Sequence, residues 1–334
     1  MEATTLGIDL AKNVFHVHGA DVRGRTVFSK RVSRRKLVEL IATLPSCLIG
    51  MEACGSSHYW ARRFHAMGHT VRLISPQFVK PYVKSNKNDR NDAEAICEAV
   101  SRPTMRFVAI KSVAQQDRQA LHRVRQRLIG QRTALINQIR GLLAEYGIVV
   151  ARQPASLRRR LPEILEDAEN DLSGQARALF AQLYDELRQL QRRINPVDEA
   201  IKAIAGEDEI CRRLQAVEGV GPLTATALTA AVGDARAFKN GRQFAAYLGL
   251  VPRQYSSGDK LRLGSISKRG DTYLRTLLIH GARNVVRWAA HRDTPRASWI
   301  RSLVQRCGAQ KAAVAVANKN ARVLWVLMAR GECY

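Results

Sequence analysis

The sequence is poor in acidic residues. It has 29 Asp and Glu against 54 Lys and Arg, so its formal net charge is +25 and its pI is near 10.6. So large a positive charge indicates a polyanionic partner, and nucleic acid is the commonest one. A protein held at a membrane surface by its basic residues is the alternative that charge alone leaves open.

Long apolar runs are also missing. No uninterrupted run reaches the roughly 18 residues that a membrane-spanning helix needs. The nearest candidate, residues 312–329, is broken by Asn318, Lys319, Asn320 and Arg322. The first residues, MEATTLGIDLAKN, lack the basic region and apolar stretch of a secretory signal. We therefore expect a cytoplasmic protein.

Cysteines are few and scattered. None of the six forms a C-x-x-C pair or a Cys/His cluster with the spacing of zinc ligands. The sequence therefore predicts neither a structural zinc site nor a disulfide framework. With 334 residues, 46% of them hydrophobic, the chain is long enough for about two or three domains with substantial cores.

The first part of the chain alternates β-rich segments with helical ones. The expected order is three antiparallel strands up to about residue 33, a helix over 34–44, a strand over 47–53, a helix over 57–68, a strand over 69–75 and a helix within 91–110. This order predicts an α/β domain with a mixed sheet. Asp9 ends the first strand and Glu52 ends a later one.

Two long amphipathic helices are expected next, over residues 112–146 and roughly 170–204. Their Leu, Ile and Val residues recur at threes, fours and sevens, a coiled-coil-like spacing that fits a helical hairpin or a dimerising arm. Residues 152–165 connect them. The other face of the first helix is basic, and Asp117 is the only acid between residues 101 and 143. Solvated arginine on a helix face is common, but we expect nucleic-acid backbone contacts here, from Arg123, Arg127 and Arg132.

Residues 205–330 are expected to be mostly helical. Within them, Gly219-Val220-Gly221-Pro222 opens a helix of small and apolar residues. This pattern matches a helix-hairpin-helix motif, in which tight glycine turns let backbone N–H groups approach a phosphate. A simple tight turn between packed helices is the alternative.

Four carboxylates are candidates for phosphate chemistry. Asp9 and Glu52 end strands, and Asp89 and Asp92 lie three apart in the motif NKNDRNDAEA, on one face if a helix begins near residue 88. Hard carboxylate oxygens suit Mg²⁺, and metal ions can stabilise the attacking and leaving oxygens of a phosphodiester. The ordinary alternatives are a helix N-cap, a turn residue and a salt-bridge partner of an arginine.

A serine offers a second kind of chemistry. Residues 249–275 read GLVPRQYSSGDKLRLGSISKRGDTYLR, a polar and flexible stretch in which two serines precede Gly258. A hydroxyl among cations could attack a phosphodiester, with the cations stabilising the anionic transition state. Without a nearby histidine base, the residues alone also fit an ordinary loop. The cations in question are Arg253, Lys260, Arg262, Lys268, Arg269 and Arg275.

Six motifs occur in order along the chain. They are GIDLAKN, GMEACGSSHYWA, NKNDRNDAEA, VEGVGPLTA, FAAYLGLVPRQYSSG and GSISKRGDTYLRTLL. The set spans essentially the whole chain and resembles the DEDD transposases of the insertion-sequence one-ten family, most closely their one-one-one-one subgroup. That family consists of serine recombinases guided by a bridge RNA. The resemblance implies an N-terminal RuvC-like (RNase H-type) domain, a coiled-coil arm and a C-terminal transposase domain.

The resemblance also implies a site. The family's acidic tetrad falls on Asp9, Glu52, Asp89 and Asp92, which would bind Mg²⁺. Its nucleophile falls on Ser257 rather than Ser256, and a covalent phosphoserine link to DNA is implied. The implied partners are donor and target DNA, a structured guide RNA, and further copies of the chain as dimers that pair into a tetramer. No membrane is involved.

The expected division is a RuvC-like metal-binding domain over 1–110, a coiled-coil or helical arm over 111–205, and a transposase domain over 206–334. The expected function is that of an insertion-sequence transposase in a bacterial cytoplasm, associated with the nucleoid. Two alternatives remain. One is a RuvC-like structure-specific nuclease that uses water, for which Ser257 is dispensable. The other is a basic nucleic-acid-binding scaffold without catalysis.

Overall fold

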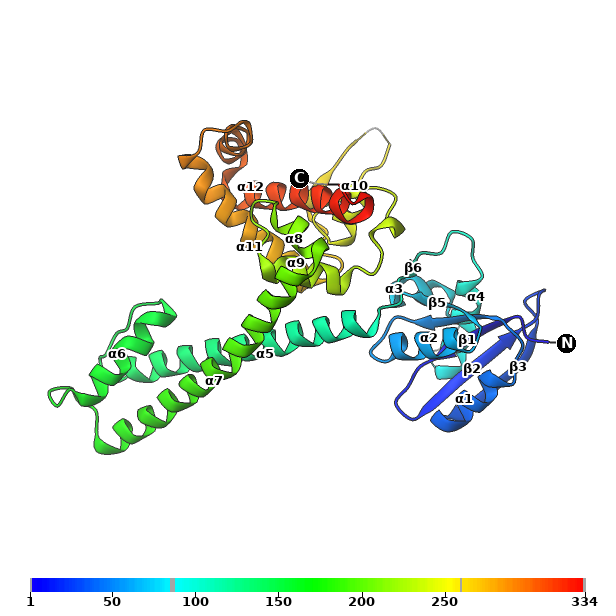
Figure 1. The fold of residues 1–334 in the computed structure, drawn as a ribbon, viewed down its shortest axis with the longest axis horizontal. Helices are drawn as coiled ribbons and strands as arrows, with labels where there is room; N and C mark the ends of the chain where they lie inside the picture. The colour runs from blue at the N-terminus through cyan, green and yellow to red at the C-terminus, as the bar shows by residue number, and fades with distance from the viewer. Residues whose placement is uncertain (1, 85–87, 259, 333–334) are drawn as a thin grey trace. The chain divides into compact units, whose positions relative to one another are not determined.

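The fold is known from a computed structural model that describes residues 2–84, 88–258 and 260–332. The chain divides into two compact units (Figure 1). The first comprises residues 1–115 and 232–237, and the second comprises residues 116–231 and 238–334. The expected division into three functional domains stays a prediction. Among the described residues, no helix has both the length and the apolarity to cross a bilayer.

The first unit is built on a mixed six-stranded sheet. In sheet order its strands are β3 (Thr26–Ser33), β2 (Val14–Ala20), β1 (Thr5–Asp9), β4 (Leu48–Glu52), β5 (Thr70–Ile74) and β6 (Phe107–Val108). The first three strands form the expected antiparallel meander, and β4 and β5 run parallel to β1. The mixed α/β fold is therefore confirmed. The short antiparallel edge strand β6 was not predicted.

Helices cover both faces of this sheet. They are α1 (Arg34–Ala42), α2 (Ser57–Ala66), α3 (Pro76–Val79), the 3₁₀ turn η1 (Lys80–Tyr82) and α4 (Asp89–Val100). The 3₁₀ turn η2 (Ala235–Ala237) also belongs to this unit. Successive side chains of a strand point to opposite faces. Leu6 and Ile8 of β1 therefore pack in the core with α1 and α2, while Gly7 faces α4.

The second unit contains a helical arm. It consists of α5 (Val113–Ala144), whose first residues lie in the first unit, with α6 (Pro154–Glu166) and α7 (Gly174–Glu207) (Figure 1). Most of the predicted apolar positions, such as Leu128, Leu187 and Ile194, form one buried core. Val124 and Leu179 are exceptions, since both are exposed. The connection between the long helices is itself largely helical, because α6 fills it. Coiled-coil geometry stays a prediction.

The rest of the second unit is mostly helical, as predicted. Its helices are α8 (Glu209–Gln215), α9 (Pro222–Ala231), α10 (Gly241–Tyr247), α11 (Thr272–Trp288), the 3₁₀ turn η3 (Ala289–His291) and α12 (Pro295–Arg330), which is kinked at Gly308. The stretch around Ser257, expected to be a flexible loop, is instead a β-hairpin formed by β7 (Pro252–Gln254) and β8 (Leu263–Ile266).

Candidate active site

Two of the predicted acids lie at one edge of the sheet. Asp9 is the last residue of β1, and Glu52 is the last residue of β4. The two strands are parallel, with Gly7 opposite Gly50 and Ile8 opposite Met51. Asp9 and Glu52, the next residue of each strand, therefore lie at the ends of two neighbouring strands, at the same edge of the sheet. By the two-residue alternation both belong to the face that α4 covers.

Two glycines bring α4 directly onto that face. A Cβ atom added at Gly7 would lie 2.1 Å from the carbonyl oxygen of Ala93, and one added at Gly50 would lie 2.8 Å from the Cβ of Val100. The thiol of Cys97 donates to the carbonyl oxygen of Thr5 at 3.6 Å. Because the chain of α4 passes from Ala93 at Gly7 to Cys97 at Thr5, it runs opposite to β1. Its first turn therefore lies toward the strand end that carries Asp9.

The other two acids lie in that first turn. Asn88 is the N-cap, and its side chain accepts a hydrogen bond from the backbone N–H of Asn91 at 2.8 Å. This excludes Asp89 or Asp92 as the cap. The helix begins earlier than the expected 91–110 and meets the condition of a start near residue 88. Asp89 Oδ2 lies 3.7 Å from Nε2 of His16, the residue of β2 directly opposite Asp9. Asn86 and Lys87 of the same motif lie outside the described residues.

We call the edge of the sheet where Asp9, Glu52, Asp89 and Asp92 lie the acid edge. The side chains of these four residues suit a hard divalent cation. All four side chains offer carboxylate oxygens, and Mg²⁺ is bound through only one or two carboxylates together with water and substrate phosphate. Within residues 2–84, 88–258 and 260–332, no three His, Cys, Asp or Glu side chains are grouped as a metal-binding set. The fold thus brings the four acids to one edge without closing them around an ion. Sequence reasoning missed His16, although the antiparallel pairing of β1 with β2 places it there.

The predicted serine lies near the tip of the β7–β8 hairpin. Gln254 pairs with Leu263, the backbone N–H of Tyr255 donates to the carbonyl oxygen of Arg262 at 2.9 Å, and Ser257 forms a bridge with Lys260. The pairing is therefore in register from residue 254 to residue 257. Gly258 then adopts a φ of +56°, a conformation that glycine tolerates best.

This register separates the two serines. Side chains alternate across the hairpin, so Ser256 shares one face with Gln254, whose Nε2 donates to Ser256 Oγ at 3.0 Å. The backbone N–H of Arg262 also donates to Ser256 Oγ, at 3.3 Å. No hydrogen bond joins Ser257 Oγ to any described residue, and Ser257 is exposed.

The face that carries Ser257 is cationic. Tyr255, Lys260 and Arg262 lie on it by the same alternation, and Arg253 borders it, since a Cβ at Gly264 would lie 3.9 Å from the Cβ of Arg253. All four side chains are exposed. The hairpin therefore presents one hydroxyl within a cluster of cations, on a surface that can accept an anionic backbone.

The base of the hairpin is fixed by tight backbone packing. A Cβ at Gly249 would lie 2.2 Å from the carbonyl oxygen of Arg269, and one at Gly270 would lie 2.0 Å from that of Tyr247. Arg275 locks this contact, because its guanidinium donates to the carbonyl oxygens of Leu248 and Arg269.

Among the predicted nucleic-acid contacts of this region, Arg275 is the one that the structure buries, with 7% of its surface exposed. We therefore assign it to the support of the hairpin and not to the binding surface. Lys268 and Arg269 are exposed and remain in the predicted set.

The arginines of α5 divide between two roles. Three arginines at intervals of seven residues contact other helices of the second unit. Arg118 pairs with Asp208 at 2.6 Å, and Arg125 pairs with Asp198. Arg132 donates to Gln191 at 2.9 Å. Arg132, one of the three predicted backbone contacts, thus stabilises the packing of α5 on α7. Arg123 and Arg127 are exposed, as a nucleic-acid contact requires.

The glycine turn before α9 packs against α11. Gly219 has a φ of +85°, and a Cβ there would lie 2.8 Å from Cγ2 of Val285 and 2.9 Å from the carbonyl oxygen of Gly281. This close contact accounts for the glycine at position 219 as a packing feature. Around Gly221 the space is open. Phosphate binding by the backbone of this turn therefore stays a prediction, and it applies to Gly221 and not to Gly219.

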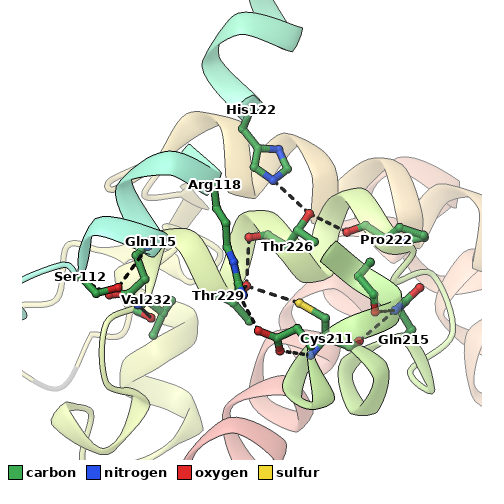
Figure 2. A network of polar contacts seen from close by, with 12 residues as sticks. Ser112, Gln115, Arg118, His122, Cys211, Gln215, Pro222, Thr226, Thr229 and Val232 are labelled. Carbon is green, nitrogen blue, oxygen red and sulfur yellow. Dashed lines mark hydrogen bonds and ion pairs between the residues drawn. The ribbon is translucent and has the colours of Figure 1, made fainter. Parts of the chain in front are cut away.

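A buried polar network joins α5 to α9 (Figure 2) and, through Tyr273, to α11. Thr226 Oγ1 donates to the carbonyl oxygen of Pro222 at 2.8 Å, so it must accept from His122 Nε2, at 3.0 Å. His122 Nδ1 lies 3.0 Å from the hydroxyl of Tyr273. Burial, together with the nearby Arg125, lowers the pKa of His122 to about 4, so the histidine is neutral at pH 7 and its Nδ1 accepts from the Tyr273 hydroxyl. No sequence motif marked this network.

This network predicts an acid-sensitive contribution to stability. The pKa of His122 is about 4 in the folded chain against an ordinary 6.5, so the unfolded chain binds the extra proton first as the pH falls. We expect the full contribution of His122 to the free energy of unfolding above pH 6.5. On acidification to pH 4, this free energy should fall by up to about 3 kcal/mol.

The check is urea unfolding between pH 7 and pH 4. His122→Gln, which keeps a donor and an acceptor, should lose part of this pH dependence, whereas His65→Gln, at an exposed position, should keep it. Equal slopes for wild type and His122→Gln would contradict the assignment of a neutral, buried His122.

Comparisons with known proteins agree with this architecture. A family model described as "Transposase", for DEDD transposases of the IS110 type, matches residues 6–148, and one described as "Transposase IS116/IS110/IS902 family" matches residues 211–297. The chain is 52% identical over 335 residues to a "Probable family 20 transposase" of Pseudomonas aeruginosa, covering 100% of this chain and 99% of that protein.

Two relatives named after insertion sequences extend the match. The chain is 48% identical over 329 residues to the "Transposase for insertion sequence element IS1111A" of Coxiella burnetii, covering 98% of this chain and 90% of that protein. It is 41% identical over 333 residues to the "Transposase for insertion sequence element IS1328" of Yersinia enterocolitica, covering 99% and 98%.

These relatives define the protein as an insertion-sequence transposase, an enzyme that processes DNA. The mixed α/β unit with its acid edge and the basic helical unit agree with this class. The chain belongs to the IS110/IS116/IS902 family of DEDD transposases. The match over residues 6–148 also suggests an RNase H-like fold for the first unit. The family expected from the sequence motifs is thus confirmed. Mg²⁺, the serine nucleophile and the guide RNA stay predictions.

Proposed function

We propose that this transposase cuts and rejoins DNA through a covalent phosphoserine intermediate at Ser257. The Ser257 oxygen attacks a backbone phosphorus, its proton leaves to solvent, and the bond from phosphorus to one sugar oxygen breaks. That sugar oxygen takes up a proton. In the second half, a sugar hydroxyl of another strand attacks the same phosphorus, and the Ser257 oxygen leaves and is reprotonated. The number of phosphodiester bonds is unchanged.

The hairpin register is the observation that supports this proposal. Ser257 is exposed on the face that also carries Lys260 and Arg262, while Ser256 is held by Gln254 and the backbone of Arg262. Cations that border the hydroxyl can bind the phosphate and stabilise the extra negative charge of the transition state. The base of the hairpin is packed backbone to backbone, which fixes where the hairpin leaves the helical unit.

The acid edge is proposed as the second part of the machinery. Asp9, Glu52, Asp89 and Asp92 are the residues that would hold Mg²⁺, which when bound withdraws charge from phosphate oxygens. His16 lies 3.7 Å from Asp89 and opposite Asp9, so it can orient these carboxylates. We propose that the reaction requires both the acid edge and Ser257.

Backbone contacts with the guide RNA or with DNA are proposed for the exposed cations. Arg123 and Arg127 on α5, with Arg253, Lys260, Arg262, Lys268 and Arg269, offer phosphate contacts that position a nucleic acid without reading its sequence. Sequence choice would then come from base pairing with the RNA. The proposed assembly is a homo-oligomer of dimers that pair into a tetramer.

The experiment that tests this function is a search for the adduct. The purified full chain, with the RNA that co-purifies, is incubated with plasmid DNA that contains the source element, in Mg²⁺ or in EDTA, and is then denatured. We expect protein covalently attached to DNA in Mg²⁺ and none in EDTA. Cleaved DNA without any attached protein would contradict the phosphoserine step.

A nuclease that uses water is the second candidate, and the acid edge is the feature that favours it. A DEDD site can activate water without a protein nucleophile, and the family model that matches residues 6–148 is that of DEDD transposases. For that enzyme the products are free ends, Mg²⁺ is still required, and Ser257→Ala has no effect on cleavage.

A further inference from the structure

We propose that Tyr255 is a stacking platform for an unpaired DNA base next to the phosphate at Ser257. Tyr255 lies two residues before Ser257 on the same face of the hairpin, so their Cα atoms are about 7 Å apart along the strand. This is comparable to the length of one nucleotide. The inference rests on the proposed function only for the position of the reacting phosphate.

The ring of Tyr255 is open to a ligand. Tyr255 is 64% exposed, so most of the surface of its side chain is accessible to a ligand. The residue beside it on the same face is Gly264, and even a Cβ added there would lie 3.7 Å from Cε2 of the ring. Glycine therefore places no side chain against the ring, and the exposed surface of the ring is available for stacking.

Charge identifies the kind of ligand. Arg262 is paired with Tyr255 across the ladder, Arg253 borders the same face, and Lys260 pairs with Ser257. An aromatic ring among three cations, with no acid among the described residues of that face, suits a base and its phosphates more than an apolar peptide. Stacking on a base is sequence-tolerant, which fits a protein whose sequence choice is proposed to come from RNA.

The opposite face of the hairpin supplies the control. Leu261 is a large hydrophobic residue that is 68% exposed, much like Tyr255, but by alternation it lies with Ser256 and Gln254. A general loss of hairpin structure or of apolar surface would make both positions matter equally. A stacking platform makes only Tyr255 matter.

The test measures binding of the full chain to a single-stranded oligonucleotide of mixed sequence that contains 2-aminopurine. Tyr255→Ala should weaken binding by roughly 5- to 100-fold and remove the fluorescence quenching that stacking causes. Tyr255→Phe and Leu261→Ala should bind and quench like the wild type. Ser257→Ala should also bind and quench normally, so failure of the serine mechanism leaves this result unchanged.

Two results would overturn the proposal. One is wild-type affinity and quenching for Tyr255→Ala. The other is a loss in Tyr255→Phe or Leu261→Ala as large as that in Tyr255→Ala, because the ring itself would then not be the cause. Since both positions are exposed, unchanged thermal unfolding of all variants is expected and is measured alongside.

Discussion

Ser257→Ala is expected to abolish the covalent protein–DNA adduct and to slow strand transfer by roughly 10³-fold or more. The change removes the oxygen that forms the intermediate, and the loss of a nucleophile is among the largest single-residue effects in enzymes. DNA binding should remain, because the cations of the hairpin are untouched and Ser257 Oγ bonds to no described residue. The measurement is the rate of recombination between two plasmids.

The neighbouring serine is the matched control for this prediction. Ser256→Ala removes a hydroxyl that accepts from Gln254 and from the backbone of Arg262, so it should destabilise the hairpin by only about 1 kcal/mol and leave the adduct detectable. If Ser256→Ala were the inactive variant and Ser257→Ala the active one, the assignment based on register would be wrong.

Among substitutions of a glycine by alanine in the first unit, Gly7→Ala is expected to lower the free energy of unfolding the most. The new Cβ would lie 2.1 Å from the carbonyl oxygen of Ala93 and 2.4 Å from the backbone nitrogen of Cys97. Neither atom belongs to a flexible side chain, so α4 must move away from β1. We expect a loss of about 3 kcal/mol or more in the free energy of unfolding.

The same change should also affect activity. Asp89 and Asp92 lie in the first turn of α4, so a displaced helix carries them away from Asp9. At a temperature where Gly7→Ala is still folded, Mg²⁺-dependent cleavage should therefore be strongly reduced. Urea unfolding measures the stability, and cleavage of plasmid DNA measures the activity.

Gly55→Ala is the control, because nothing lies within 4 Å of a Cβ at that position. Its stability should be within about 0.5 kcal/mol of the wild type. Equal stability for the two variants would mean that α4 does not lie directly on β1.

Local sequence patterns predicted the parts of the site that depend on local structure. Strand alternation placed Asp9 and Glu52 at strand ends, and the helix-forming run after Asn88 placed Asp89 and Asp92 in one turn. These features follow from side-chain periodicity and capping, which act over a few residues. The order of the motifs then predicted the family, which the relatives confirm.

The parts that sequence reasoning missed depend on distant partners. The arginines of α5 looked like one basic face, but Arg118 meets Asp208 and Arg125 meets Asp198, acids that are 90 and 73 residues further along the chain. Burial alone would raise the pKa of Asp208, but the N–H of Cys211 and the guanidinium of Arg118 outweigh it and lower that pKa. A count of charges along one helix cannot show such pairing.

The hairpin was missed for a different reason. Two serines and a glycine suggested a loop, although residues 254–257 and 260–263 pair as a ladder. Arg275 likewise looked like a surface cation, but the packing of Gly249 against Arg269 creates buried carbonyl oxygens that its guanidinium satisfies. Buried polar groups need such partners, and which residue provides them is decided by the fold.

The most direct test of the central claim is to identify the residue that carries DNA in the trapped adduct. Trypsin cleavage after Arg253 and Lys260 releases residues 254–260, a peptide that contains Tyr255, Ser256 and Ser257. After nuclease digestion, mass spectrometry should find the remaining nucleotide on this peptide, and fragmentation should place it on Ser257. A nucleotide on Tyr255 or Ser256, or on any other peptide, would contradict the account.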